Sequence, residues 1–89
     1  MDVRLKKLRK EIDDIDSKIV ELIEQRMKVV CEVGDLKKDL EISVEDLNRE
    51  KEIIQRLTSN SSKNLTEKQL IRIFSAVFKS SKQIQRDNK

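Results

Sequence analysis

The sequence has no histidine and no proline, one cysteine at Cys31 and one glycine at Gly34. Without histidine, imidazole catalysis is excluded and the commonest metal ligand is missing. A lone cysteine cannot close an intrachain disulfide or supply the ligands of a structural zinc site. Aromatic residues make up only 2% of the chain, which disfavours sheets, and the lack of helix breakers favours helices. We therefore expect a helical protein without a disulfide framework, a structural zinc site or imidazole catalysis.

Long apolar runs are absent as well. No stretch approaches the roughly 20 apolar residues of a membrane span, and the N-terminus lacks the apolar core of a signal peptide. These absences predict a cytoplasmic protein without a membrane partner. Charged residues make up 42% of the chain, but 20 basic residues face 17 acidic ones and leave a net charge of +3. A balance this small does not by itself indicate a nucleic-acid partner.

The first half of the chain carries one long amphipathic repeat, and it predicts a helix from about residue 3 to about residue 40. At about 1.5 Å per residue this helix would span roughly 55 Å. A compact chain of 89 residues has a diameter of only about 30 Å, so the helix is longer than any core that one chain could build. We therefore predict an intertwined homodimeric helical bundle. The apolar residues recur at steps of three and four: Leu5, Leu8, Ile12, Ile15, Ile19, Leu22, Val29, Val33, Leu36 and Leu40.

A second helix is predicted over about residues 44–58. Ser43 followed by Asp46 resembles a capping box, in which a side chain accepts from the first free N–H groups of a helix. Ile42 and Leu47 are spaced to form the hydrophobic staple around that box.

A third helix is predicted over about residues 67–86. Thr66 and Gln69 repeat the capping-box pattern at its start. With no internal repeat and no further break, the sequence predicts an all-α fold of three helices in a single domain over residues 1–89.

Polar side chains interrupt the apolar face of each predicted helix. Each has an ordinary explanation. An arginine on an apolar face can extend its guanidinium to solvent, and a glutamine there can fix how two helices align. A guanidinium that stays buried without an anion costs several kcal/mol, roughly. Together these side chains predict an electropositive pocket in the bundle, suited to an anion with more than one carboxylate or phosphate. They are Arg26 and Lys37 in the first helix, Glu50 in the second, and Ser81 and Gln85 in the third.

Several short motifs follow one another between about residue 5 and residue 85. They are Leu8-Arg9-Lys10-Glu11-Ile12-Asp13 with Asp16, Glu24-Gln25-Arg26, Val33-Gly34-Asp35-Leu36-Lys37, Asp46-Leu47-Asn48-Arg49-Glu50, and Ile73-Phe74 with Ser81 and Gln85. This set resembles the all-helical class of chorismate mutases, in its stand-alone form. The resemblance implies an isomerase that converts chorismate to prephenate by a Claisen rearrangement, in the shikimate pathway to phenylalanine and tyrosine. It implies no cofactor and no metal.

The resemblance also assigns the groups that bind the two carboxylates of chorismate. Arg26 would bind them together with Arg9, which would reach into the site from the other subunit. Arg49 would support this grip, and Ser81 would touch a carboxylate.

Four further residues are assigned to the ether oxygen and the ring hydroxyl. Lys37 and Gln85 would hydrogen-bond the ether oxygen, which becomes more negative in the transition state. Glu50 would accept from the ring hydroxyl, and Asp46 would contribute beside it largely through its backbone. Lys37, Gln85, Glu50 and Arg26 are thus the predicted catalytic residues.

Two alternatives remain at this stage. An isochorismate pyruvate-lyase would share the fold, but those proteins tend to lack the acid after the second-helix arginine and the serine of the third helix. Both Glu50 and Ser81 are present here. A basic coiled coil that binds nucleic acid or a partner is the other alternative, although the sequence has almost no aromatic residues for base stacking.

Overall fold

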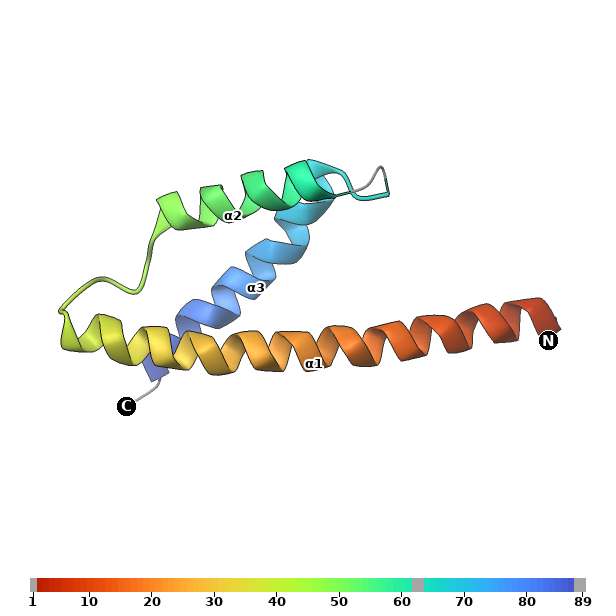
Figure 1. Ribbon diagram of the computed structural model, residues 1–89, viewed down its shortest axis with the longest axis horizontal. Coiled ribbons are helices and arrows are strands. Elements are labelled where there is room, and N and C mark those ends of the chain that lie inside the picture. The colour runs from red at the N-terminus through yellow and green to blue at the C-terminus, as the bar shows by residue number, and fades with distance from the viewer. Residues whose placement is uncertain (1, 62–63, 88–89) are drawn as a thin grey trace.

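The computed structural model describes residues 2–61 and 64–87, and it is built from three α-helices (Figure 1). They are α1 (Val3–Asp39), α2 (Leu47–Asn60) and α3 (Glu67–Asp87). No strand occurs in the described part of the chain. The predicted all-α fold with a long first helix is therefore confirmed.

The long helix α1 begins at a side-chain cap and ends at a left-handed residue. The carboxylate of Asp2 accepts from the N–H of Arg4. At the other end Glu41 has φ 56°, and the N–H of Ile42 donates to the carbonyl of Lys37 at 2.8 Å. This hydrogen bond and the left-handed turn make up a Schellman motif, in which glycine is the usual left-handed residue. The motif turns the chain away from the axis of α1 and toward α2.

The predicted start of α2 is wrong by about three residues. Asp46, not Ser43, is the N-cap, and its carboxylate accepts from the N–H of Arg49 at 3.0 Å. The Ser43 hydroxyl instead accepts from the N–H of Glu45 at 3.2 Å, in a local turn. The backbone therefore becomes helical only at Leu47, and α2 continues to Asn60, two residues beyond the expected end.

The start of α3 follows the sequence prediction. The Thr66 N–H donates to the side-chain oxygen of Gln69 at 2.9 Å, and the Gln69 N–H donates to the Thr66 hydroxyl at 3.2 Å. These reciprocal bonds are the predicted capping box. The helix runs from Glu67 to Asp87, one residue past the expected end.

The contacts between helices are concentrated at one end of the molecule. α3 packs against both α1 and α2, crossing the C-terminal half of α1 (Figure 1). At this crossing the buried Gly34 faces Gln85 so closely that a β-carbon added there would lie 2.9 Å from Gln85 Cγ and 3.1 Å from its Cα. The apolar core is small, because the only buried hydrophobic side chains among the described residues are those of Ile53, Leu70 and Phe78.

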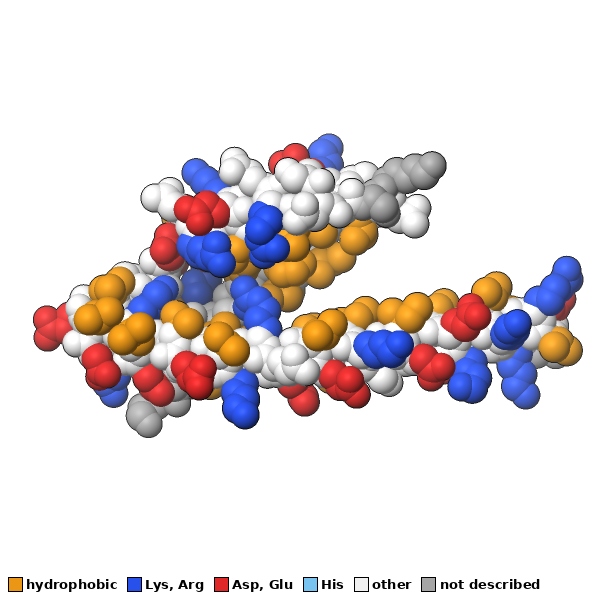
Figure 2. All heavy atoms as spheres, viewed as in Figure 1, with side chains coloured by type: hydrophobic (Ala, Val, Ile, Leu, Met, Phe, Trp, Pro, Cys, Tyr) orange, Lys and Arg blue, Asp and Glu red, His pale blue; other side chains and the backbone are white. Residues whose placement is uncertain are grey.

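The N-terminal part of α1 extends away from this core. Every described residue up to Gln25 is exposed. The radius of gyration is 16.5 Å and the extents are 56 × 27 × 16 Å, whereas a compact chain of this length has a radius of gyration of about 12 Å. Figure 2 shows apolar side chains in a row along this extension. The row is formed by Leu5, Leu8, Ile12, Ile15, Ile19 and Leu22, which are 42–63% exposed.

None of the described helices has the length and apolar character required to cross a membrane.

Candidate active site

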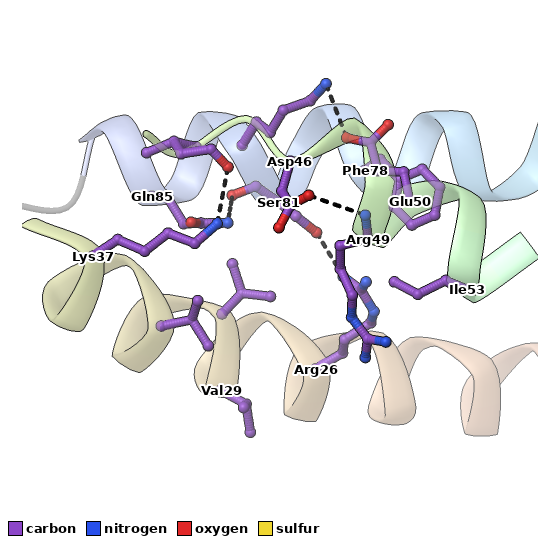
Figure 3. A pocket seen from close by; sticks show the side chains of 14 residues that line it. Arg26, Val29, Lys37, Asp46, Arg49, Glu50, Ile53, Phe78, Ser81 and Gln85 are labelled. Carbon is purple, nitrogen blue, oxygen red and sulfur yellow. Dashed lines mark hydrogen bonds and ion pairs between the residues drawn. The ribbon is translucent and has the colours of Figure 1, made fainter. Parts of the chain in front are cut away.

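A cavity of about 270 Å³ lies where the three helices approach one another. The C-terminal half of α1, the segment before α2, the start of α2 and the C-terminal half of α3 all contribute to its wall (Figure 3). Seven of the eight predicted site residues line it. They are Arg26, Lys37, Asp46, Arg49, Glu50, Ser81 and Gln85.

Arg9, the eighth predicted residue, is not part of this cavity. It lies on the N-terminal extension of α1, beside a shallow hollow that it shares with Lys6 and Asp13. The two arginines, Arg9 and Arg26, are separated by about 25 Å along the helix axis at 1.5 Å per residue. Arg9 therefore does not reach the cavity of its own chain.

Arg26 is half-buried and is held by neutral groups. Its Nη1 donates to the hydroxyl of Ser81 at 2.6 Å, and its guanidinium carbon lies 6.0 Å from the centroid of the Phe78 ring. Burial lowers the pKa of Arg26 from its ordinary value, and the nearby charge of Arg49 lowers it further. Among the residues that the structure describes, no carboxylate forms an ion pair with Arg26. An anion in the cavity would therefore stabilise this charge.

Ser81 is the buried anchor for Arg26, with 6% of its surface exposed. Its hydroxyl accepts from Arg26 and donates to the carbonyl of Val77, one turn earlier in α3, at 2.7 Å. Because both bonds use the same oxygen, Ser81 fixes the position of the Arg26 guanidinium against α3.

Lys37 and Gln85 lie at one end of the cavity, and Arg26 and Arg49 lie at the other (Figure 3). The Nζ of Lys37 donates to the carbonyl of Val44 at 3.1 Å. The Nε2 of Gln85 donates to the carbonyl of Ser81 at 3.3 Å, and its Oε1 is buried with no hydrogen-bond partner in the described residues. Both nitrogens have further hydrogens to donate, since an ammonium has three and an amide has two.

The start of α2 brings in two carboxylates and one guanidinium. Asp46 caps the helix through the N–H of Arg49, so its carboxylate is already used for structure. The guanidinium of Arg49 forms an exposed ion pair with Glu52 at 3.5 Å. Glu50 forms an ion pair with Lys82 of α3, with 3.2 Å between its Oε2 and the lysine Nζ.

The sequence profile of the chorismate mutase type II family matches residues 8–86. The chain belongs to this family. A chorismate mutase of Methanocaldococcus jannaschii is 34% identical over 84 residues, which are 93% of this chain and 85% of that protein. The activity is therefore the conversion of chorismate to prephenate, a step in aromatic amino acid biosynthesis. This finding decides against both the isochorismate pyruvate-lyase and the basic coiled coil.

Solved chorismate mutases share the whole fold. The enzyme of Helicobacter pylori, crystallised in complex with prephenate, superposes with a TM-score of 0.92 at 30% identity, over 98% of this chain and 94% of its own. A structure of the enzyme from Thermus thermophilus gives a TM-score of 0.92 at 28% identity, over 97% and 98% of the two chains.

The charge of the cavity suits the substrate of a chorismate mutase. Two carboxylates, of Asp46 and Glu50, are present against four cations, a formal balance of +2. Chorismate carries two carboxylates, so its charge would offset this excess. The described residues contain no cluster of acidic or cysteine side chains that could hold a metal ion. The four cations are Arg26, Lys37, Arg49 and Lys82.

Lys82 is the charged wall residue that sequence reasoning missed. It follows Ser81, and it lies four residues after Phe78 and three before Gln85, so the helical spacing places all three on one face of α3. That spacing was the available signal. A lysine in a chain this rich in charge is easily assigned to the solvated face instead.

Proposed function

We propose that this chorismate mutase binds one chorismate dianion in the cavity described above, and that it works as an intertwined homodimer with two such sites. One observation supports placing the substrate here: side chains from all three helices converge on a single cavity with an excess of positive charge. Arg26 is its clearest anion-binding group, because its pKa is lowered by burial and its contacts are neutral.

The homodimer is supported by what one chain leaves exposed. The three buried apolar residues of the described chain make a poor core, while the row along the N-terminal part of α1 remains in solvent. Exposed apolar patches of this extent mark association surfaces. In a symmetric dimer the partner covers the row, and the extension carries Arg9 to the other subunit's cavity. The proposed site is therefore incomplete without a second copy.

The reaction requires orientation and charge stabilisation rather than a nucleophile. In the rearrangement the ether C–O bond breaks while a new C–C bond forms within the same molecule. In our proposal Arg26 and the partner's Arg9 bind the carboxylates and hold the compact chair geometry in which the two reacting ends meet. Arg49 supports this grip from the start of α2, and Ser81 holds Arg26 and touches a carboxylate.

Charge that develops during the reaction is assigned to the opposite end of the cavity. As the ether bond lengthens, its oxygen gains negative charge. Lys37 and Gln85 donate to that oxygen, so they stabilise the transition state more than the bound substrate. Glu50 accepts from the ring hydroxyl and orients the ring, and Asp46 maintains the start of α2 beside it.

Replacing Lys37 tests the proposal directly. We expect Lys37→Ala to lower kcat by about 10²-fold, the usual effect of removing one donor to a developing oxyanion. Following the disappearance of chorismate and the formation of prephenate measures this effect. Lys38→Ala is the matched control, because Lys38 is the exposed neighbour in the same turn of α1 and should retain full turnover. A Lys37→Ala enzyme with unchanged kcat would contradict the assignment of Lys37 to the ether oxygen.

A further inference from the structure

One lysine in the cavity wall is already paired with carboxylates. The Nζ of Lys82 lies 3.2 Å from Glu50 Oε2 and 3.9 Å from Glu45 Oε2. The side chains of Lys82 and Glu50 are only 22% and 24% exposed, so solvent screens this pair weakly. One ammonium on α3 therefore connects α2 with the segment that precedes it.

We propose that Lys82 is a positioning residue for Glu50 and thereby determines how the enzyme recognises the ring hydroxyl of its substrate. This inference rests on the proposed function, in which Glu50 accepts a hydrogen bond from that hydroxyl. Lys82 holds Oε2 of the carboxylate and leaves Oε1 for the substrate.

The partners of its charge distinguish Lys82 from Arg26 and Lys37, two of the cations assigned to the substrate. The charge of Lys82 is directed at carboxylates of the protein itself. Arg26 and Lys37 instead donate to a hydroxyl and a backbone carbonyl, which leave their charge uncompensated. Lys82 therefore acts on Glu50 rather than on the dianion.

The ion pair of Lys82 and Glu50 also keeps the other cations of the cavity available for the substrate carboxylates. A glutamate side chain has three rotatable bonds, and a Glu50 without its lysine could turn toward the other cations of the same cavity. Such a pair would neutralise a charge that the substrate carboxylates need. By holding Glu50 on α3, Lys82 keeps the recognition of the hydroxyl separate from the recognition of the carboxylates.

The test combines a double-mutant cycle with a second substrate. The parent, Lys82→Met, Glu50→Gln and the double variant are assayed with chorismate and with an analogue whose ring hydroxyl is replaced by hydrogen. The hydroxyl takes no part in bond making or breaking, so the analogue can still rearrange. We expect Lys82→Met to lower kcat/KM for chorismate about tenfold, the typical effect of losing a charged hydrogen-bond arrangement. We expect little change with the analogue, and no further loss when Lys82→Met is added to Glu50→Gln.

The controls separate positioning from folding. Lys79→Met removes an exposed lysine from the same helix and should leave both substrates unaffected. Lys82→Arg should retain most activity because it keeps the charge beside Glu50. Circular dichroism melts report whether each variant folds, and Lys82→Gln replaces Lys82→Met in the cycle if the latter does not fold.

Two results would overturn the inference. If Lys82→Met impairs both substrates equally, or adds its full effect in the Glu50→Gln background, then Lys82 acts on the dianion or on the fold. The role of Glu50 would survive that result. If Glu50→Gln alone keeps parental activity and discrimination between the substrates, then the role of Glu50 is wrong, and the inference about Lys82 falls with it.

Discussion

Arg26 and Ser81 show how a buried serine and a half-buried arginine can prepare a cavity for an anion. The Ser81 hydroxyl accepts from the guanidinium and donates to the carbonyl of Val77 in the same helix. Together the two bonds fix the guanidinium against α3. A carboxylate in place of Ser81 would have neutralised Arg26, whereas a hydroxyl orients it and leaves its charge available. The lowered pKa of Arg26 records that unrelieved charge.

Gln85→Glu tests the contact between α3 and the ether oxygen. An ionised carboxylate would repel the developing negative charge, but a protonated one can donate a hydrogen bond. Because an ordinary glutamate has a pKa of about 4.3, we expect activity to fall steadily as pH rises from the acidic range to neutrality. The measurement is kcat as a function of pH, with Gln83→Glu on the exposed side of α3 as the control. A flat profile from about pH 5 to pH 8 would mean that Gln85 does not contact the ether oxygen.

Gly34→Ala tests whether the close approach of α1 and α3 places Gln85. A methyl group at Gly34 would lie 2.9 Å from Gln85 Cγ and 3.1 Å from Gln85 Cα, so the Gln85 side chain or α3 must shift. Alanine also raises the helix propensity of α1 by about 1 kcal/mol, which offsets part of the cost in stability. We therefore expect the free energy of unfolding to change little while kcat falls roughly ten- to a hundred-fold, as misplacing a catalytic group does. Urea unfolding and steady-state kinetics on the same variant measure both, and an unchanged kcat would contradict the prediction.

At the scale of helices, the turn that ends α1 places a glutamate, Glu41, in a backbone conformation that favours glycine. Glu41 adopts the left-handed conformation, which costs an L-residue about 1 kcal/mol and glycine almost nothing. We expect Glu41→Gly to raise the free energy of unfolding by about 0.5 kcal/mol, since the greater freedom of glycine in the unfolded chain removes part of the gain. Lys38→Gly, inside the last turn of α1, should lower it by about 1 kcal/mol. Denaturant unfolding at one fixed protein concentration compares the three chains, and a loss of stability in Glu41→Gly would contradict this account.

The same turn explains where sequence reasoning about the fold succeeded and failed. The Thr66–Gln69 box was predictable because both partners lie within one turn and bond to each other. The Asp46 cap was not predictable, because the left-handed residue of the Schellman motif is Glu41 rather than the glycine that usually marks such a motif in a sequence. With that motif in place, Ser43 bonds within its own turn and Asp46 becomes the cap.

The site was predictable to the extent that it depends on helical spacing. Residues that interrupt an apolar stripe, such as Arg26 and Gln85, can be read from one chain, and both line the cavity. Lys82 could not be distinguished from a solvated lysine until α2 and α3 were placed together. The role of Arg9 stays a prediction, because its proposed target belongs to another copy of the chain.

At the scale of the whole molecule, the exposed extension of α1 predicts sites shared between two chains. We expect Arg9→Ala and Arg26→Ala homodimers to be almost inactive. Unfolding and refolding an equal mixture should give half heterodimers, each with one intact site, and so recover about a quarter of the parental activity. Chorismate turnover before and after mixing measures this recovery. Sites confined to single chains would recover nothing, and sedimentation that shows a stable folded monomer at micromolar concentration would contradict the dimer itself.

The apolar row on α1 has a consequence for how the protein is made. It lies in the first third of the sequence, so it is synthesised before α2 and α3. In the finished chain, none of the described residues covers this row. In a dimer of the proposed kind, folding must then wait for an encounter between two chains, and its rate should rise with their concentration. Until that encounter the exposed row leaves newly made chains open to aggregation, and neighbouring ribosomes on one message would supply the partner soonest.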